Sequence, residues 1–284
     1  MTVAELKRHI IGELTPAVGA REAQAMMREI FLVLKGYTPA DVVINGDRTV
    51  LDQTVDRVNG WIERVRDGEP FQYVIGRAPF MGMELTVTPA VLIPRPETAQ
   101  LVDMITDYAR GRSDLNVLDV GTGSGCIALA LARALPFSRV TGVDISDAPL
   151  QVARHNAGEY KIANVDFIKA DALNLSAYKL PTPFDIIVSN PPYIAESEKK
   201  EMDPRVYDHE PQGALFVPDS DPLVFYRAIS LYARDNLTPA GILFFEINPL
   251  FVKELKSMLQ SQDWSSVDIL ADYRGRQRFA FCRL

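Results

Sequence analysis

The tetrapeptide Asn190-Pro191-Pro192-Tyr193 contains the residue types needed to orient a planar amino group. It follows an apolar run, 184–188, that predicts a strand, and open α/β sheets bind ligands beyond the carboxyl ends of their strands. The Asn190 side-chain oxygen and the Pro191 carbonyl can accept both hydrogens of an –NH2 group, in a loop that the prolines restrict. Tyr193 offers a ring face to a planar group and to a nearby sulfonium cation. The pattern predicts methylation of a planar nitrogen, although a simple Pro-Pro turn leaving a strand has the same residues.

A glycine-rich turn lies upstream, after a short apolar strand predicted over 116–119. Glycines at 121, 123 and 125 have the spacing G-x-G-x-G, whereas the fingerprint for a dinucleotide pyrophosphate is G-x-G-x-x-G. Asp119, just before the turn, would repel a pyrophosphate but suits the cationic amino group of a methionine. The turn therefore favours S-adenosylmethionine, a cofactor without phosphate, although a lone glycine-rich turn is weak evidence.

Two further predicted strands end in acidic residues. The run 139–143 leads to Asp144, at the place where a carboxylate accepts the two hydroxyl hydrogens of a ribose. The alternative roles are a helix N-cap or a loop carboxylate. The run 164–168 leads to Asp171 and Ala172, which we expect beside the adenine. Polar groups at four strand ends are thus expected at one edge of the sheet. Together they indicate a cofactor site more specifically than any one of them does alone. The predicted cofactor-binding residues are Asp119, Gly121, Thr122, Gly123, Ser124, Gly125, Asp144, Asp171, Ala172 and Asn190.

From about Phe71 to its end, the chain resembles the release factor glutamine methyltransferases, the HemK/PrmC family. The matching stretches are 71–76, Leu92-Ile93-Pro94-Arg95-Pro96-Glu97-Thr98, 119–125, 190–194 and 272–278. The stretch Pro94-Arg95-Pro96-Glu97-Thr98 separates this family from other N-methyltransferases that share the tetrapeptide. One departure is Ile247-Asn248-Pro249, where the family commonly has a glycine after the late strand 241–246. The first 70 residues match only in helical character.

The resemblance implies methylation of the side-chain amide nitrogen of the glutamine in the Gly-Gly-Gln segment of peptide-chain release factors. It also implies that Arg95 and Glu97 line the substrate mouth, although Pro96-Glu97 equally suits the first turn of a helix. Glu210-Pro211 is a candidate lid segment. The predicted catalytic residues are Asn190, Pro191 and Tyr193, and the predicted substrate-binding residues are Asn190, Pro191, Pro192, Tyr193, Arg95 and Glu97.

Composition restricts the classes of protein that fit. The 284 residues are 47% hydrophobic and 24% charged, as in an ordinary globular protein with a real core. The beginning of the chain lacks a secretory apolar region, and no apolar run approaches membrane-spanning length. The two cysteines and three histidines do not cluster, so we expect neither a disulfide framework nor a metal site. We expect a cytoplasmic protein, and nothing in the sequence demands more than a monomer.

The domain organisation follows from the periodicity of the apolar residues. Residues 1–70 predict a small helical domain that docks the substrate, with Val55, Val58, Ile62 and Val65 forming one apolar stripe. Residues 71–96 predict a β-hairpin or linker. In residues 97–284 strands alternate with helices, which predicts an α/β fold with a seven-stranded, mainly parallel, Rossmann-like methyltransferase sheet. The strands are expected at 116–119, 139–143, 164–168, 184–189, 240–247, 265–270 and 277–283, the last two as a hairpin.

Two other functions compete with glutamine methylation. An N-methyltransferase of an exocyclic amino group in RNA or DNA could use the same amide clamp once the base is flipped out of its stack. The net charge of −7 and the scattered basic residues favour a protein substrate over nucleic acid. A scaffold that binds the cofactor and partners without catalysis is the other alternative, but it has no use for Asn190-Pro191-Pro192-Tyr193.

Overall fold

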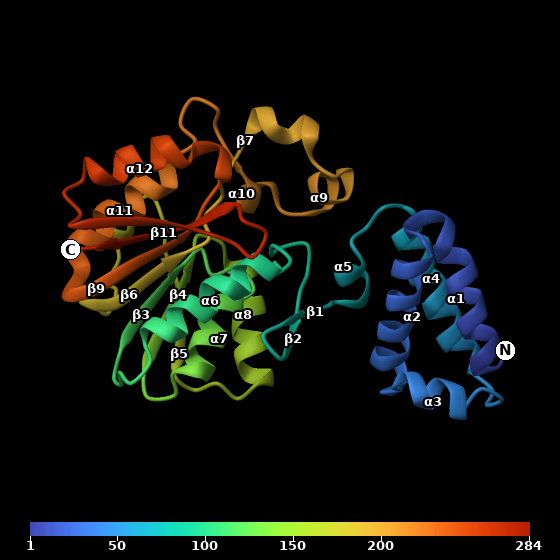
Figure 1. Ribbon diagram of the computed structural model, residues 1–284. Coiled ribbons are helices and arrows are strands. Elements are labelled where there is room, and N and C mark those ends of the chain that lie inside the picture. Colours follow the sequence, from blue (N-terminus) through green and yellow to red (C-terminus); the bar gives the residue numbers. More distant parts are fainter. The chain divides into compact units, whose positions relative to one another are not determined.

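The computed structural model describes residues 1–284, which divide into two compact units. Unit 1 comprises Met1–Arg77 and Asp203–His209, and unit 2 comprises Ala78–Met202 and Glu210–Leu284. Figure 1 shows unit 1 as a group of helices and unit 2 as a sheet with helices on its two faces. No helix in the structure is both long enough and apolar enough to cross a membrane.

Unit 1 consists mainly of helices and has its own apolar core. Its first helix begins at a capping box, in which Thr2 and Glu5 each accept a hydrogen bond from the other's backbone N–H. Leu6, Ile10 and Leu14 follow at four-residue spacing and are fully buried, as one face of an amphipathic helix should be. The helices are α1 (Val3–Val18), α2 (Ala20–Lys35), α3 (Pro39–Ile44), α4 (Asp52–Arg66), α5 (Phe71–Ile75) and α9 (Pro204–His209).

The unit boundaries differ from the predicted domain boundaries in two places. The segment 71–75 forms helix α5, and Val74 packs in the core of unit 1, so this part of the predicted hairpin or linker is helical. The segment 203–209 also groups with unit 1, although it lies far along the chain. Local sequence patterns do not predict this grouping, because it depends on contacts between residues that are distant in the chain.

The centre of unit 2 is the predicted seven-stranded sheet, with the order β10-β11-β9-β6-β3-β4-β5. The pairs β9–β6, β6–β3, β3–β4 and β4–β5 are parallel, whereas β11 runs antiparallel to both neighbours and forms the predicted terminal hairpin with β10. The strands are β3 (Asn116–Val120), β4 (Arg139–Asp144), β5 (Val165–Lys169), β6 (Phe184–Ser189), β9 (Leu237–Glu246), β10 (Ser266–Ala271) and β11 (Gln277–Arg283).

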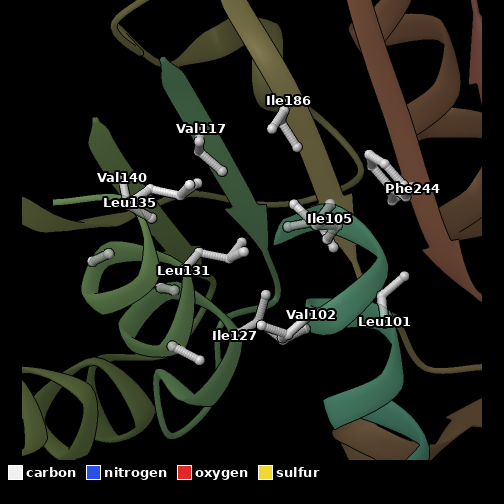
Figure 2. Packing of buried hydrophobic residues seen from close by; sticks show 14 of the residues in the cluster. Leu101, Val102, Ile105, Val117, Ile127, Leu131, Leu135, Val140, Ile186 and Phe244 are labelled. Carbon is white, nitrogen blue, oxygen red and sulfur yellow. The ribbon is translucent and has the colours of Figure 1, made fainter. Parts of the chain in front are cut away.

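Helices cover both faces of this sheet, because successive strand residues point to opposite sides. Val117 and Ile186 face the layer that contains α6 and α7, as Figure 2 shows, whereas Leu118 and Ile187 face α11 and α12. The central strands are therefore apolar on both sides. All the α-helices of unit 2 are α6 (Pro96–Tyr108), α7 (Cys126–Ala134), α8 (Asp147–Glu159), the short α10 (Gln212–Leu215), α11 (Val224–Asn236) and α12 (Val252–Gln260).

Short elements complete unit 2. The hairpin predicted within 71–96 is formed by β1 and β2, and its residues Phe80, Met83 and Leu85 join the core on the α6–α7 side. A second two-stranded sheet, β7 with β8, follows the tetrapeptide. The bounds are β1 (Arg77–Phe80), β2 (Met83–Thr86), β7 (Ile194–Ala195), β8 (Phe216–Val217), and, for three 3₁₀ helices, η1 (Leu175–Ala177), η2 (Glu196–Glu201) and η3 (Pro249–Phe251).

The parallel pairing brings five strand ends to one edge of the sheet. The strands β3, β4, β5, β6 and β9 run in the same direction, so their carboxyl ends and the loops that follow lie together. Four of these loops carry the residues predicted from sequence. The fifth strand ends in Glu246, a buried carboxylic acid that was not assigned a role.

Candidate active site

A cavity of about 510 Å³ lies at this edge of unit 2. Most of the predicted site residues line it, namely Arg95, Gly121, Thr122, Gly123, Ser124, Asp144, Asp171, Ala172, Asn190, Pro191 and Pro192. Four predicted residues, Asp119, Gly125, Tyr193 and Glu97, do not line the cavity. The remainder of the wall is mostly apolar and includes Ile145, Leu173 and Phe225.

The glycine-rich turn is fixed by its own backbone hydrogen bonds. The N–H groups of Gly121 and Thr122 donate to the Val143 carbonyl at 2.9 and 2.8 Å, and Gly123 N–H donates to Asp144 Oδ2 at 3.1 Å. Gly121 and Gly123 have φ angles of 77° and 54°, which side chains with a Cβ rarely adopt. Because these N–H groups are already engaged, the turn is not an anion cradle.

Asp144 is half-buried in the cavity wall at the end of β4. Its two carboxylate oxygens accept hydrogen bonds from the backbone N–H groups of Gly123 and Ser146, which leaves each oxygen with a further lone pair. Removal from water raises the pKa of this carboxyl group. Ile145 and Leu173 line the same cavity with 62% and 45% of their surface exposed, so they offer apolar walls to a flat ring.

Asp119 lies behind the turn and not in the cavity wall. It is fully buried, and its Oδ2 accepts hydrogen bonds from Thr122 Oγ1 at 2.7 Å and from Ala128 N–H at 3.1 Å. Its Oδ1 has no hydrogen-bond partner. Burial raises the pKa of Asp119 from 3.8 to about 7. The carboxyl group therefore ties the glycine-rich turn to the first turn of α7.

We expect Asp119 to make the stability of the protein depend on pH. In the folded chain the pKa of Asp119 is about 7, above its ordinary value of 3.8. At pH values between these two, the folded chain therefore binds a proton at Asp119 more tightly than the unfolded chain does. The free energy of unfolding should fall as pH rises through this window. Urea unfolding of wild type and Asp119→Asn at about pH 5 and about pH 8 measures this difference. The variant keeps an oxygen for Thr122 and should lose less stability on going to the higher pH; equal losses would contradict the assignment.

The tetrapeptide presents unused acceptors to the cavity. Asn190 donates from Nδ2 to Thr98 Oγ1 at 3.2 Å, and no protein group donates to its Oδ1. The Pro191 carbonyl accepts no backbone hydrogen bond either, and both residues line the cavity. This pair of acceptors matches the two hydrogens of an –NH2 group.

A buried network lies beneath the tetrapeptide. Glu246 accepts a hydrogen bond from Thr98 Oγ1 at Oε2 (2.7 Å) and another from the Tyr193 hydroxyl at Oε1 (3.2 Å). Arg278 donates to the same Tyr193 oxygen at 3.4 Å. Burial raises the pKa of Glu246, whereas the Thr98 hydrogen bond and the charge of Arg278 act in the opposite direction. The last residue of the tetrapeptide, Tyr193, thus has its hydroxyl turned to Glu246.

Two residues of this network, Thr98 and Glu246, were not predicted from sequence to have a role. Glu246 had a usable signal, because it is an acidic residue at a strand end, like Asp144. Thr98 follows Glu97 in α6, but its sequence position gives no indication of its contact with a residue more than ninety positions away. Glu97 itself lies in the first turn of α6 and does not line the cavity, in agreement with the alternative reading of Pro96-Glu97 as a helix start.

Arg95 is held at the cavity by a buried carboxylate. Its guanidinium lies 2.5 Å from Glu210 Oε1, and the Glu210 side chain is 1% exposed. The other oxygen of Glu210 accepts from Ile93 N–H at 3.4 Å. Pro211 lines the cavity directly, so the candidate lid segment contributes one wall residue and one residue that fixes Arg95.

In the segment Ile247-Asn248-Pro249, which departs from the family pattern, the Asn248 side chain makes three hydrogen bonds. The Asn248 side-chain nitrogen donates to the Tyr193 carbonyl and to Glu198 Oε1, both at 2.9 Å, and its oxygen accepts from Leu250 N–H. Asn248 therefore joins the loop after β9 to the end of the tetrapeptide, and the cavity lining does not include it.

Family models match two parts of the chain. Residues 5–76 match the model of the PrmC N-terminal domain, and residues 112–231 match the model of a methyltransferase domain. A release factor glutamine methyltransferase of Bacteroides thetaiotaomicron is 40% identical over 257 residues, which cover 90% of this chain and 91% of that protein. The chain belongs to the release factor glutamine methyltransferase family. Another member, from Flavobacterium psychrophilum, is 34% identical over 98% of both chains.

Solved structures that resemble the chain have the expected fold. The hMettl16 catalytic domain superposes with a TM-score of 0.57 at 17% identity and covers 84% of each chain. A T. thermophilus 16S rRNA methyltransferase, RsmC, in complex with AdoMet and guanosine gives a TM-score of 0.54 at 21% identity, over 73% of this chain and 49% of that one. The resemblance to the release factor glutamine methyltransferases and the Rossmann-like α/β fold, both predicted from sequence, are confirmed.

Proposed function

We propose that this protein transfers a methyl group from S-adenosylmethionine to the side-chain amide nitrogen of a glutamine in peptide-chain release factors. The observation that carries this proposal is the pair of unused acceptors, Asn190 Oδ1 and the Pro191 carbonyl, on the cavity wall. Family membership supplies the release factor as the substrate. The methylated glutamine is that of the Gly-Gly-Gln segment, and unit 1 docks the factor. The protein acts in the cytoplasm as a monomer.

The cavity fits S-adenosylmethionine better than a dinucleotide. The N–H groups of Gly121, Thr122 and Gly123 are already engaged, so the turn allows close backbone approach but offers no cradle for a pyrophosphate. Asp144 retains lone pairs that would accept the hydrogens of the two ribose hydroxyls, and the adenine would be held by the wall residues Ile145, Asp171, Ala172 and Leu173. When bound, S-adenosylmethionine supplies an electrophilic methyl group on its sulfonium sulfur.

Asn190 and Pro191 hold the glutamine amide in a reactive orientation. An amide nitrogen is a poor nucleophile because its lone pair is delocalised into the carbonyl. When both N–H groups donate to fixed acceptors, the plane of the amide is set and electron density on nitrogen is partly restored. Positioning of this kind lowers a barrier by roughly 7–11 kcal/mol in well-oriented reactions. The nitrogen ends with one hydrogen and one methyl group, and the other hydrogen leaves as a proton.

Methyl transfer to competing substrates tests the substrate class. Wild-type protein is incubated with radiolabelled S-adenosylmethionine and, in separate reactions, a purified release factor, ribosomal RNA or duplex DNA. We expect label on the release factor alone. Label on RNA or DNA, with none on the factor, would replace this proposal by methylation of an exocyclic amino group.

A further inference from the structure

The Thr98 hydroxyl connects Glu246 to the side-chain amide of Asn190. Its oxygen lies 2.7 Å from Glu246 Oε2 and 3.2 Å from Asn190 Nδ2. Thr98 and Glu246 are 2% and 1% exposed, so water does not compete for these contacts. The connection joins helix α6, the end of β9 and the loop after β6 beside the cavity.

The chemistry of the hydroxyl determines which way the amide points. A hydroxyl has one hydrogen to donate, and Glu246 accepts hydrogen bonds at both oxygens, from Thr98 and from Tyr193. The Thr98 hydrogen is therefore used on Glu246, and toward Asn190 the hydroxyl can only accept. An acceptor requires a donor, so Asn190 must present Nδ2 to Thr98. Its Oδ1 is left for the substrate.

We propose that Thr98 and Glu246 are positioning residues that fix the Asn190 amide with its oxygen toward the substrate, and thereby select a glutamine over a glutamate. The inference rests on the proposed function, since it concerns the same clamp. A glutamine –NH2 group donates to the fixed oxygens of Asn190 and Pro191. A glutamate carboxylate at the same place offers only acceptors and is repelled. A free Asn190 could turn over and donate Nδ2 to that carboxylate.

Glu246 also fixes the other end of the tetrapeptide. Tyr193 donates to its second oxygen, and Arg278 donates to the Tyr193 oxygen. The Glu246 carboxylate thus contacts Tyr193 directly and is connected to Asn190 through Thr98. Both oxygens of Glu246 are thus engaged in buried hydrogen bonds, which restrict Asn190 and Tyr193 to one orientation.

Three threonine variants separate this role from general stability. Thr98→Val removes the hydroxyl and keeps the shape, whereas Thr98→Ser keeps the hydroxyl. Thr106→Val is the matched control, because Thr106 lies on the same helix with a buried Oγ1 that has no partner. Each variant is assayed for kcat and KM with a release factor, and for inhibition by the same factor carrying glutamate in place of the methylated glutamine. Unfolding and cofactor affinity are measured alongside.

We expect Thr98→Val to lower kcat by about tenfold with little change in KM, because one oriented hydrogen bond is lost. We also expect a change in the inhibition constant of the factor that carries glutamate, divided by the KM of the factor that carries glutamine. This ratio should fall by about tenfold, because the released Asn190 amide can rotate and donate Nδ2 to the glutamate. Thr98→Ser should restore that ratio, and Thr106→Val should leave it unchanged. A merely structural role for Thr98 would alter stability without altering the ratio.

Glu246→Gln keeps the test decisive if Thr98→Val does not fold. A glutamine at 246 can donate to Thr98, which frees the Thr98 hydrogen for Asn190 Oδ1 and lets the amide reverse. The preference for the glutamine factor should again decrease. Unchanged preference in the folded variants, with an active wild type, overturns the positioning role alone. If the wild type transfers no methyl group to the factor, the proposed function fails, and this inference with it.

Discussion

Replacing Asn190 with alanine is expected to reduce methyl transfer to a release factor by roughly 100- to 1000-fold, the usual cost of losing one preorganised polar contact. The acceptor Oδ1 is removed, so one amide hydrogen of the glutamine has no partner and the plane of the amide is no longer fixed. Cofactor affinity should remain within a few-fold of wild type, because the proposed ribose and adenine contacts lie at Asp144 and Asp171. Steady-state rates and calorimetric cofactor titration measure the two quantities.

Asn236→Ala is a suitable control for this substitution. Asn236 is the last residue of α11, donates to the Tyr232 carbonyl and does not line the cavity. Its replacement should leave the transfer rate close to wild type. Equal losses of transfer rate and cofactor affinity in Asn190→Ala would count against the clamp and indicate a general collapse of the cavity.

Replacing Asp144 with alanine is expected to weaken S-adenosylmethionine binding by about 100-fold. Hydrogen bonds to charged groups contribute roughly 1.5–3 kcal/mol each, and in the proposed cofactor site two ribose hydroxyls would lose their acceptor. The backbone N–H groups of Gly123 and Ser146 also lose theirs, so the turn becomes less ordered. Isothermal titration gives the affinity directly. The release factor KM at saturating cofactor should change little.

Asp166→Ala provides the matched comparison, because Asp166 is an exposed acid on β5 outside the cavity lining. It removes the same charge from the protein without touching the cavity. If Asp144→Ala binds the cofactor as tightly as Asp166→Ala does, the ribose assignment is wrong.

Candidate site residues could be predicted from sequence where they lie at the end of a strand. Parallel strands align their carboxyl ends whatever the details of packing, so Asp144, Asp171 and Asn190 could be placed together from local patterns alone. The same rule applies to Glu246, whose acidic side chain also follows an apolar run. The seven strands were predictable for the same reason, because the apolar runs and their spacing are local properties.

Features that depend on the direction of a side chain were not predictable. Asp119 and Tyr193 were expected to face the ligand, but Asp119 turns to Thr122 and Ala128, and Tyr193 turns to Glu246. The contact of Thr98 with Asn190 likewise depends on how α6 packs on the sheet. Periodicity identifies the buried face of a helix, yet it does not specify which distant residue that face meets.

Site-resolved mass spectrometry of a release factor tests the central claim most directly. A purified factor is incubated with S-adenosylmethionine and either wild-type protein or Asn190→Ala, then digested and sequenced by fragmentation. We predict one added methyl group on the side-chain nitrogen of the Gly-Gly-Gln glutamine with wild type, and almost none with the variant. A methyl group on a carboxylate, a lysine or another residue, or equal methylation by both proteins, would contradict the amide clamp.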